Sequence, residues 1–573
     1  MKTFADVVRS RTGDTHEGLR FEGRSWTWDE VVREAAVRAA LLKTFPVDAE
    51  RGQRHVGVLL QNVPDFVFWL LGAALSGDVV VGINPTRRGQ ELCHDIRHSD
   101  CDLLVSEPLY LDADDRPALP LPTERILDVE SPVYEELLAQ HQGAPVPGTG
   151  PDPAATYLLL FSSGSTGAPK AVICTTGRLG RLTDRMAERI SLHRDSVAYL
   201  CLPLFHGHAI MMNLAAAAYV GATVVMVRKF SASRFAEDIR RHRVTYFNYV
   251  GRVLSYILAR PAVPDESVNS LEVAFGSEAS PAEAQAFRDR FGCEVREGYG
   301  ASEGVIRIVP VPGSPPDSLG LPVPGLAAVI CKEDGSECPR ARFDGQGWLL
   351  NTEEATGEIV VLGQGPSFEG YYKNPEAMAQ RLRFGGKDFW TGDLAYRDED
   401  GYFYFAGRSS DWLRVDGENF ATAPLERILA RYPAFSDAHA YAVPDPRTGD
   451  QVMCAVTLRH GETFDADGFA AFLDAQPDLG TKWRPSFIRV LAAVPTTANR
   501  KIDKAPLRAT AWEAEDVWWA PTRDSTYRPL TQEQRAAIRE EFRVAGRENA
   551  LPTASRSLRQ TDRLVSPRPG SVE

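Results

Sequence analysis

The sequence predicts an α/β protein with a large N-terminal domain of parallel-rich sheets and helices, a small β subdomain, and a small α/β domain toward the C-terminal end. Apolar runs typical of buried strands alternate with helical segments over roughly the first 300 residues, as in parallel sheets covered on both faces. Short β runs follow from about residue 325, and a compact α/β unit follows Arg408. A chain of 573 residues is also too long for one core, so several units are expected.

The N-terminal elements begin with a helix and a buried strand. Thr27 and Glu30 have the spacing of a capping box before the helical segment 31–42, and the apolar run 55–60 is typical of a strand inside a parallel sheet. An apolar helix at 65–75 and a strand at 79–85 continue the alternation. Further strands are expected at 156–162, 196–203, 223–227, 245–250, 271–276 and 294–300.

The stretch from Ala209 to Val227 is uncharged and almost long enough to cross a membrane. Asn213 and Gly221 interrupt this stretch, and β-branched residues follow the glycine. We therefore predict a helix that ends before Gly221 and a strand over 223–227, and no transmembrane segment.

The pattern of predicted helices and strands changes in the second half of the chain. Its expected elements are β runs at 327–332, 357–363 and 401–407, a helix at 425–432, strands at 437–444 and 452–459, and a helix at 466–476. We expect domains over 1–408 and 409–520 and a C-terminal extension over 521–573. The end of the extension, 551–573, is rich in Pro, Ser and Arg and poor in apolar groups, which predicts disorder.

Composition limits the class of partner and the compartment. A net charge of −13 and a pI near 5.5 oppose a nucleic-acid footprint or an anionic-membrane anchor, both of which need a dominant basic face. The eight cysteines are scattered without a CxxC pair, and the N-terminus lacks the apolar core of a signal peptide. These features predict a cytoplasmic protein without disulfides or a metal cluster. They leave the oligomeric state open, with a homodimer as one alternative.

A polar loop follows the strand at 156–162. The segment FSSGSTGAPKA, 161–171, has six consecutive Ser, Thr or Gly residues and then Pro169 and Lys170. Backbone N–H groups and hydroxyls in such a loop can wrap phosphates, and Lys170 adds a positive charge. The spacing does not match a Walker A loop. A flexible Gly/Ser connector is the alternative interpretation.

Two later segments carry side chains suited to a nucleotide. In EGYGASEG, 297–304, Tyr299 offers a stacking face and Glu303 a hard oxygen ligand for phosphate-bound Mg²⁺. In 390–408, Asp393 can accept hydrogen bonds from both ribose hydroxyls, and Arg408 can reach ribose or phosphate. Each residue taken alone also fits a structural turn or a solvated surface charge.

Five segments, in order, resemble one superfamily. FSSGSTGAPK, GYGASE, WTGDL, GRSSDWLRVDGENF and PTTANRKIDK are similar to motifs of the adenylate-forming superfamily of acyl-CoA synthetases, adenylation domains and luciferases, over about residues 20–510. The segment YVGRVLSYILARP at 249–261, the RVDGENF pattern and YRPLT at 527–531 resemble the fatty acid transport protein and very-long-chain acyl-CoA synthetase branch. The resemblance implies an acid–thiol ligase that uses ATP, Mg²⁺ and coenzyme A and forms an acyl-AMP intermediate from a fatty or other hydrophobic acid.

The resemblance also implies where the phosphates bind. Thr166 and Glu303 would hold the magnesium-bound phosphates and belong to the catalytic set. The phosphate-loop residues carried over are Ser162, Ser163, Gly164, Ser165, Thr166, Gly167 and Lys170.

For the adenosine, the resemblance implies that Tyr299 stacks on adenine and that Asp393 and Arg408 take the ribose. The other residues carried over to the nucleotide site are Gly276, Ser277, Glu278, Gly300 and Ser302.

Two parts of the C-terminal domain would serve different half-reactions. Lys501 matches the catalytic lysine that bridges the carboxylate and the α-phosphate during adenylation, whereas Gly417, Glu418 and Asn419 resemble the loop that accompanies thioester formation with coenzyme A. Because both cannot face one site at once, the domain is expected to be mobile, with Ser410 as its hinge.

Three residues would lie beside the acid. His206 in PLFHGHA matches a residue next to the acyl pocket, although a core histidine that satisfies a buried carbonyl fits equally well. Tyr249 and Gly251 lie in an apolar segment, 246–258, that suits a long acyl chain or a fused-ring acid.

Two other functions stay open at this stage. An adenylating enzyme could transfer its acyl group to a carrier protein or stop at acyl-AMP, and a non-catalytic homologue could bind nucleotide or acyl groups only. Retention of Lys501, Glu303 and Asp393 disfavours the non-catalytic alternative.

Overall fold

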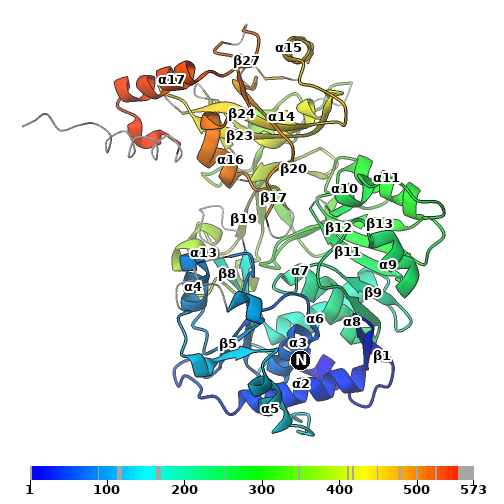
Figure 1. Cartoon of the computed structure of the whole chain (residues 1–573). Coiled ribbons are helices and arrows are strands. Elements are labelled where there is room, and N and C mark those ends of the chain that lie inside the picture. Colours follow the sequence, from blue (N-terminus) through cyan, green and yellow to red (C-terminus); the bar gives the residue numbers. More distant parts are fainter. Residues whose placement is uncertain are drawn as a thin grey trace, which may run out of the picture.

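The computed structural model describes residues 3–87, 89–111, 119–162, 170–251, 253–345, 349–408, 412–415, 418–447, 449–476, 479–480, 482–497, 501–522 and 525–552. For Ser162, Arg408, Trp412, Arg414, Glu418 and Asn419 the description covers the backbone alone. In Figure 1 the large N-terminal part lies at the bottom and the residues after 412 form a separate layer at the top.

Two parallel-rich sheets form the N-terminal part, as the sequence predicts. In the described chain, the first has the order β13 (Glu294–Glu297), β12 (Val273–Ser277), β11 (Tyr246–Val250), β9 (Val197–Leu200), β10 (Thr223–Met226), β1 (Glu17–Phe21) and β2 (Arg24–Thr27). The second has the order β6 (Ile126–Asp128), β5 (Leu103–Ser106), β3 (His55–Leu59), β4 (Val79–Gly82), β7 (Thr156–Ser162) and β8 (Lys170–Thr175). Only the pairs β1–β2 and β7–β8 are antiparallel in these two sheets as described.

The predicted helix cap near the N-terminal end of the chain is confirmed. Thr27 and Glu30 form the expected capping box at the start of α2 (Trp28–Leu42). Gly72 of α3 (Pro64–Ser76) lets α2 approach closely, because a Cβ there would lie 2.8 Å from the carbonyl oxygen of Ala35. The other helices of this part are α1 (Phe4–Arg9), α4 (Gly89–His98), α5 (Pro132–Ala139), α6 (Thr176–Arg189), α9 (Phe235–His242), α10 (Val253–Leu258) and α11 (Pro281–Phe291).

The uncharged stretch from Ala209 to Val227 lies mostly within helices and a strand. These are α7 (Gly207–Ala209), a π-helical turn (Ile210–Leu214), α8 (Ala215–Val220) and, after Gly221 at φ 79°, strand β10. Asn213 lies in the π-helical turn and donates to Asn248 Oδ1 at 2.8 Å and to the carbonyl of Tyr199 at 3.1 Å. Across the described ranges, no helix is both long and apolar enough to cross a membrane.

The β subdomain consists of two small sheets. One has the order β14 (Tyr299–Gly300), β15 (Arg307–Val309) and β16 (Leu321–Pro322), and the other β17 (Ala328–Cys331), β18 (Gly357–Val361), β19 (Phe389–Arg397) and β20 (Phe403–Arg408). The short helices α12 (Thr352–Ala355) and α13 (Pro375–Arg381) accompany them. The prediction of a single strand over 294–300 is wrong. The chain leaves the sheet of β12 and β13 after Glu297 and joins the sheet of β14 and β15 at Tyr299.

A separate hydrophobic core supports the C-terminal unit. It starts with the hairpin β21 (Trp412–Val415) and β22 (Glu418–Ala421), followed by α14 (Thr422–Leu429). Its main sheet has the order β23 (Phe435–Pro444), β24 (Asp450–Leu458), β25 (Phe487–Leu491), β26 (Val517–Trp519) and β27 (Arg528–Pro529). The remaining helices are α15 (Ala466–Asp474), α16 (Ala505–Thr510) and α17 (Gln532–Val544).

The C-terminal extension packs on this unit as far as it is described. Strand β27 pairs with β26, and Phe542 of α17 stacks on Trp512 with ring centres 5.7 Å apart. The predicted hinge, Ser410, lies outside the described residues, and so does 553–573 of the segment 551–573 predicted to be disordered. Leu551 and Pro552 are described and buried, so the prediction of disorder is wrong for these two residues.

Candidate active site

Lys501 of the C-terminal unit reaches the N-terminal part of the molecule. Its Nζ atom forms an ion pair with Glu278 Oε1. Glu278 directly follows β12 and has φ 75°, a backbone conformation that residues other than glycine rarely adopt. Both side chains keep contact with solvent, with exposed fractions of 34% for Lys501 and 43% for Glu278.

Two histidines lie within electrostatic reach of Lys501. Burial, reinforced by the Lys501 charge, lowers the pKa of both His206 and His208 to about 3. Both imidazoles are therefore neutral near pH 7. Asn248 donates to His208 Nδ1 over 3.1 Å, which orients this ring. His208 is a residue that the motifs did not single out.

Tyr299 and Asp393 form a second part of the site. The Tyr299 hydroxyl donates to Asp393 Oδ2 at 2.6 Å, joining β14 to β19. The backbone N–H of Asp393 donates to Thr391 Oγ1 at 3.1 Å. Arg408 is the cross-strand partner of Asp393 in the register of β19 and β20. The structure therefore brings together the stacking tyrosine, the acid and the backbone of the arginine that the sequence assigned to adenosine.

Glu303 is the centre of a third group. Its carboxylate is only 9% exposed and accepts a 2.5 Å hydrogen bond from the Tyr371 hydroxyl, which itself accepts from Arg381 Nε at 3.1 Å. Lys170 Nζ lies 5.6 Å from the centre of the Tyr371 ring. Burial, then the charge of Arg381, lowers the pKa of Lys170, while Glu303 opposes this shift. The sequence missed Tyr371 and Arg381, because no spacing connects them with Glu303.

The phosphate loop connects two paired strands. Ser162, the last residue of β7, is the register partner of Lys170, the first residue of β8. The predicted phosphate-loop residues Ser163, Gly164, Ser165, Thr166 and Gly167 lie outside the described residues. Ser162 lies at the carboxyl end of β7, and this end of a strand is where α/β folds bind ligands.

Tyr249 lies beneath the predicted adenine-binding stretch and is fully buried. Its hydroxyl donates to Glu297 Oε1, and a Cβ on Gly276 would lie only 2.4 Å from its ring. Burial raises the pKa of Glu297 to about 7, although the Tyr249 hydrogen bond opposes the shift. Gly251, at φ 57°, donates from its N–H to the carbonyl of Ser277 at 3.1 Å. These contacts support the adenine-side backbone, and direct contact of Tyr249 and Gly251 with the acid stays a prediction.

The remaining predicted residues are on turns and strand ends. The Ser302 carbonyl accepts from Arg178 Nη2 at 2.5 Å, and Gly300 pairs with Arg307 across β14 and β15. In the β21–β22 hairpin, Glu418 pairs with Val415, whereas Gly417 lies outside the described residues.

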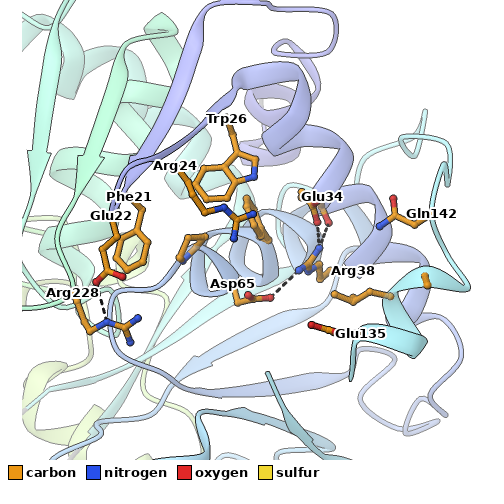
Figure 2. A pocket seen from close by; sticks show the side chains of 14 residues that line it. Phe21, Glu22, Arg24, Trp26, Glu34, Arg38, Asp65, Glu135, Gln142 and Arg228 are labelled. Atoms are coloured by element: carbon orange, nitrogen blue, oxygen red, sulfur yellow. Dashed lines mark hydrogen bonds and ion pairs between the residues drawn. The ribbon is translucent and has the colours of Figure 1, made fainter. Parts of the chain in front are cut away.

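Away from these groups, a cavity of about 540 Å³ opens between β2, α2, α3 and α5 (Figure 2). Arg38 points into it and is paired with Glu34 and with Asp65, at 2.8 Å for Asp65. None of the predicted site residues lines this cavity. Arg228 of the lining is paired with Glu22 at 3.3 Å.

Comparisons with known proteins identify the family of both parts of the chain. The family described as AMP-binding enzyme matches residues 7–372, and the family described as AMP-binding enzyme C-terminal domain matches residues 424–501. Steroid-22-oyl-CoA synthetase of Rhodococcus jostii is 45% identical over 552 residues, or 96% of this chain and 99% of that protein. The medium/long-chain-fatty-acid–CoA ligase FadD17 of Mycobacterium marinum is 41% identical over 521 residues, or 91% of this chain and 98% of that protein.

Solved structures share the fold. The crystal structure of ATP-bound MatB from Rhodopseudomonas palustris has a TM-score of 0.76 with this chain at 20% identity, covering 89% of this chain and 99% of that one. At this identity the likeness concerns the large and small parts of the fold, and the chemistry has to come from the site itself.

Proposed function

The chain belongs to the AMP-binding enzyme family, and we propose that it is an acyl-CoA synthetase that joins a hydrophobic carboxylic acid to coenzyme A with cleavage of ATP to AMP and pyrophosphate. The relatives that cover nearly the whole chain are named as CoA ligases of a steroid acid and of medium- and long-chain fatty acids. Their names support a large apolar acid as the substrate.

The ion pair between Lys501 and Glu278 carries this proposal. It brings a cation from the C-terminal unit to the end of β12, within electrostatic reach of His206. In adenylation, one oxygen of the acid carboxylate attacks the α-phosphorus of ATP and the bond to pyrophosphate breaks. Both reactants are anionic, so a cation that contacts the carboxylate and the α-phosphate lowers their repulsion in the transition state. Lys501 is the residue for this role.

The adenosine is held by Tyr299 and Asp393. Asp393 accepts from the Tyr299 hydroxyl through one oxygen, and a carboxylate has further acceptor positions for ribose hydroxyls. This contact fixes the Tyr299 ring, which is then available for stacking on adenine. The phosphates would lie between Lys170 and the loop that precedes it.

Glu303 fits the magnesium ion that accompanies ATP. Among the described residues, no cluster of three or more His, Cys, Asp or Glu side chains could hold a metal ion on its own. Mg²⁺ bound with a nucleotide takes one or two carboxylates, phosphate oxygens and waters, so a single buried carboxylate beside Lys170 suits it. The ion would neutralise charge on the phosphates. Thr166 would add a hydroxyl.

The second half-reaction forms the thioester. The thiol sulfur of coenzyme A attacks the acyl carbonyl carbon, the bond from that carbon to the AMP oxygen breaks, and the thiol proton is released. We assign the start of β22, with Glu418 and Asn419, and the preceding residue Gly417 to this step. This requires the C-terminal unit, with a boundary near Arg408, to turn away from the position in which Lys501 contacts Glu278.

We also assign the enzyme to the cytoplasm. All eight cysteines are buried free thiols, which suits a reducing compartment.

A two-arm assay tests the proposed function. Purified protein is incubated with ATP, Mg²⁺ and a panel of fatty, aryl, sterol and amino acids, and pyrophosphate and AMP are measured with and without coenzyme A. The proposal expects AMP release that depends on coenzyme A and an acyl-CoA product. Pyrophosphate release without any response to coenzyme A would instead support transfer to a carrier protein, and no release with any acid would remove the proposal.

A further inference from the structure

Arg189, the last residue of α6, lies against the nucleotide-site strands. Its Cζ atom is 4.9 Å from the centre of the Phe275 ring on β12. Its Nη2 atom is 2.3 Å from the point that a Cβ on Gly298 would occupy. Gly298 is the residue at which the chain passes from β13 to β14, directly before Tyr299. The guanidinium group therefore packs against the backbone of the segment that carries Tyr299.

No carboxylate of the described chain pairs with this guanidinium. Burial, then the positive charge of Arg307, lowers the pKa of Arg189 to about 10. Nearby arginines differ in this respect, since Arg296 pairs with Glu294 at 2.6 Å and Arg178 lies 3.5 Å from Glu369.

Arg307 on β15 has surroundings similar to those of Arg189. Burial and then the charge of Arg185 lower its pKa, and its side chain likewise has no carboxylate partner in the described parts of the chain. Arg189 is thus partly buried beside the charge of Arg307, and Arg307 beside that of Arg185, in a protein whose net charge is −13. A buried charge without a partner costs stability, so such a pair is expected to meet its acceptor in a ligand.

Arg189 and Arg307 lie on the side of the site where the carboxylic acid substrate is proposed to bind. The His208 ring stacks against the same Phe275 ring at 6.1 Å between centres, and both Lys501 and Arg189 lower the pKa of His208. His208 is thus within electrostatic reach of two cations: Lys501, where the reacting carboxylate of the acid would lie, and Arg189, toward which the other end of the acid would point. An acid whose carboxylate lies at Lys501 and whose body passes Phe275 would approach Arg189.

We propose that the acid carries a second hydrogen-bond-accepting oxygen at the end remote from its reacting carboxylate, and that Arg189, assisted by Arg307, binds this oxygen. A ketone and a carboxylate share this acceptor chemistry, and Arg189 can serve either one. The inference rests on the proposed acyl-CoA synthetase function and narrows its substrate class from hydrophobic acids to hydrophobic acids with a distal oxygen.

Matched acids test the inference. We would measure kcat/KM for pyrophosphate release with dodecanoate, 11-oxododecanoate and dodecanedioate, and with one fused-ring acid with and without a ring ketone. Wild-type protein is expected to prefer at least one oxygenated acid of each set by about tenfold or more, as expected for a hydrogen bond to a buried charge. The ketone and carboxylate arms show which acceptor is used.

Three variants locate the preference. Arg189→Met should bring the ratio of oxygenated to plain acid close to one, Arg307→Met should reduce it, and Arg194→Met, whose side chain is paired with Asp14 at 2.6 Å, should leave it unchanged. Activity on the plain acid should persist in all three.

Two outcomes overturn the inference and leave the proposed function intact: a wild-type enzyme that handles plain and oxygenated acids equally, or an Arg189→Met variant with the wild-type ratio. If Arg189 only stabilises the C-terminal end of α6, the variant will lose activity equally on all acids and its melting temperature will fall. Failure of every acid to release pyrophosphate would instead refute the proposed function.

Discussion

Lys501 and Glu278 pair their side chains across 223 residues of sequence, one from the C-terminal unit and one from the end of β12. This contact describes one position of the C-terminal unit, with its lysine beside the segments assigned to the nucleotide and the acid. The proposed role of Lys501 in adenylation requires this position, because the lysine would there contact both reacting anions.

Replacement of Lys501 by Ala should therefore separate the half-reactions. Acyl-adenylate formation, measured as pyrophosphate release, should fall by about 100-fold or more, because one well-placed donor contributes this much to an anionic transition state. Thioester formation from supplied acyl-AMP should change by much less. Lys504→Ala serves as the matched control, since Lys504 lies on the same unit and is paired with Glu426 at 2.9 Å. Equal losses in both half-reactions of Lys501→Ala would reject this role.

Tyr299 should act mainly through its ring. Tyr299→Phe removes the hydrogen bond to Asp393 but keeps the stacking face, and KM for ATP should rise less than about fivefold. Tyr299→Leu removes the ring and should raise KM by about tenfold or more, since stacking on a base contributes roughly 1–3 kcal/mol. Steady-state kinetics with varied ATP decides this. An effect of Phe as large as that of Leu would show that the hydroxyl, and not the ring, is the important group.

The sequence predicted the chemistry of these residues better than their contacts. The capping box at Thr27 and the strand ends near Ser162 and Ser277 are local features, which spacing and composition record. By contrast, the hydrogen bond from Tyr371 to Glu303 joins positions 68 residues apart, and only the β subdomain brings them together. The chain also changes sheets at Gly298, where Arg189 lies against the backbone, and a single glycine inside a predicted strand does not by itself reveal such a change.

Glu297 should make stability depend on pH. Its folded pKa of about 7 lies above its usual 4.5, so the folded state holds a proton that the unfolded state releases between these values. The carboxyl group therefore costs no stability below about pH 4.5, becomes destabilising as the pH rises toward 7, and costs a constant amount above that, of order 3 kcal/mol. Glu297→Gln should remove this cost. Denaturant unfolding of both proteins from about pH 5 to 8 should give a difference that grows in favour of Gln, whereas parallel curves would contradict the buried, protonated carboxyl.

Activity should increase with the apolar size of the acid. Each buried methylene contributes about 0.8 kcal/mol, so kcat/KM should rise steeply from acetate to at least medium-long acids and should be poor on amino acids. A chain-length series with pyrophosphate release as the readout tests this, with a fused-ring acid as a second shape. A preference for acetate or for an amino acid would contradict the hydrophobic acid site.

The two half-reactions also require a hinge, and the sequence places it at Ser410, outside the described residues. Arg408 ends β20 of the large part and Trp412 starts β21 of the small one, so few residues are available to absorb the rotation. Ser410→Pro fixes φ near −65° and restricts Ser409 as well. If that angle suits the position in which Lys501 meets Glu278, the variant should still release pyrophosphate and accumulate bound acyl-AMP, while acyl-CoA formation falls by orders of magnitude. Ser410→Ala, which leaves φ free, should behave as wild type. Unchanged acyl-CoA formation in the proline variant would show that the rotation occurs elsewhere, and lost adenylation with intact thioester formation would show that proline fixed the other position.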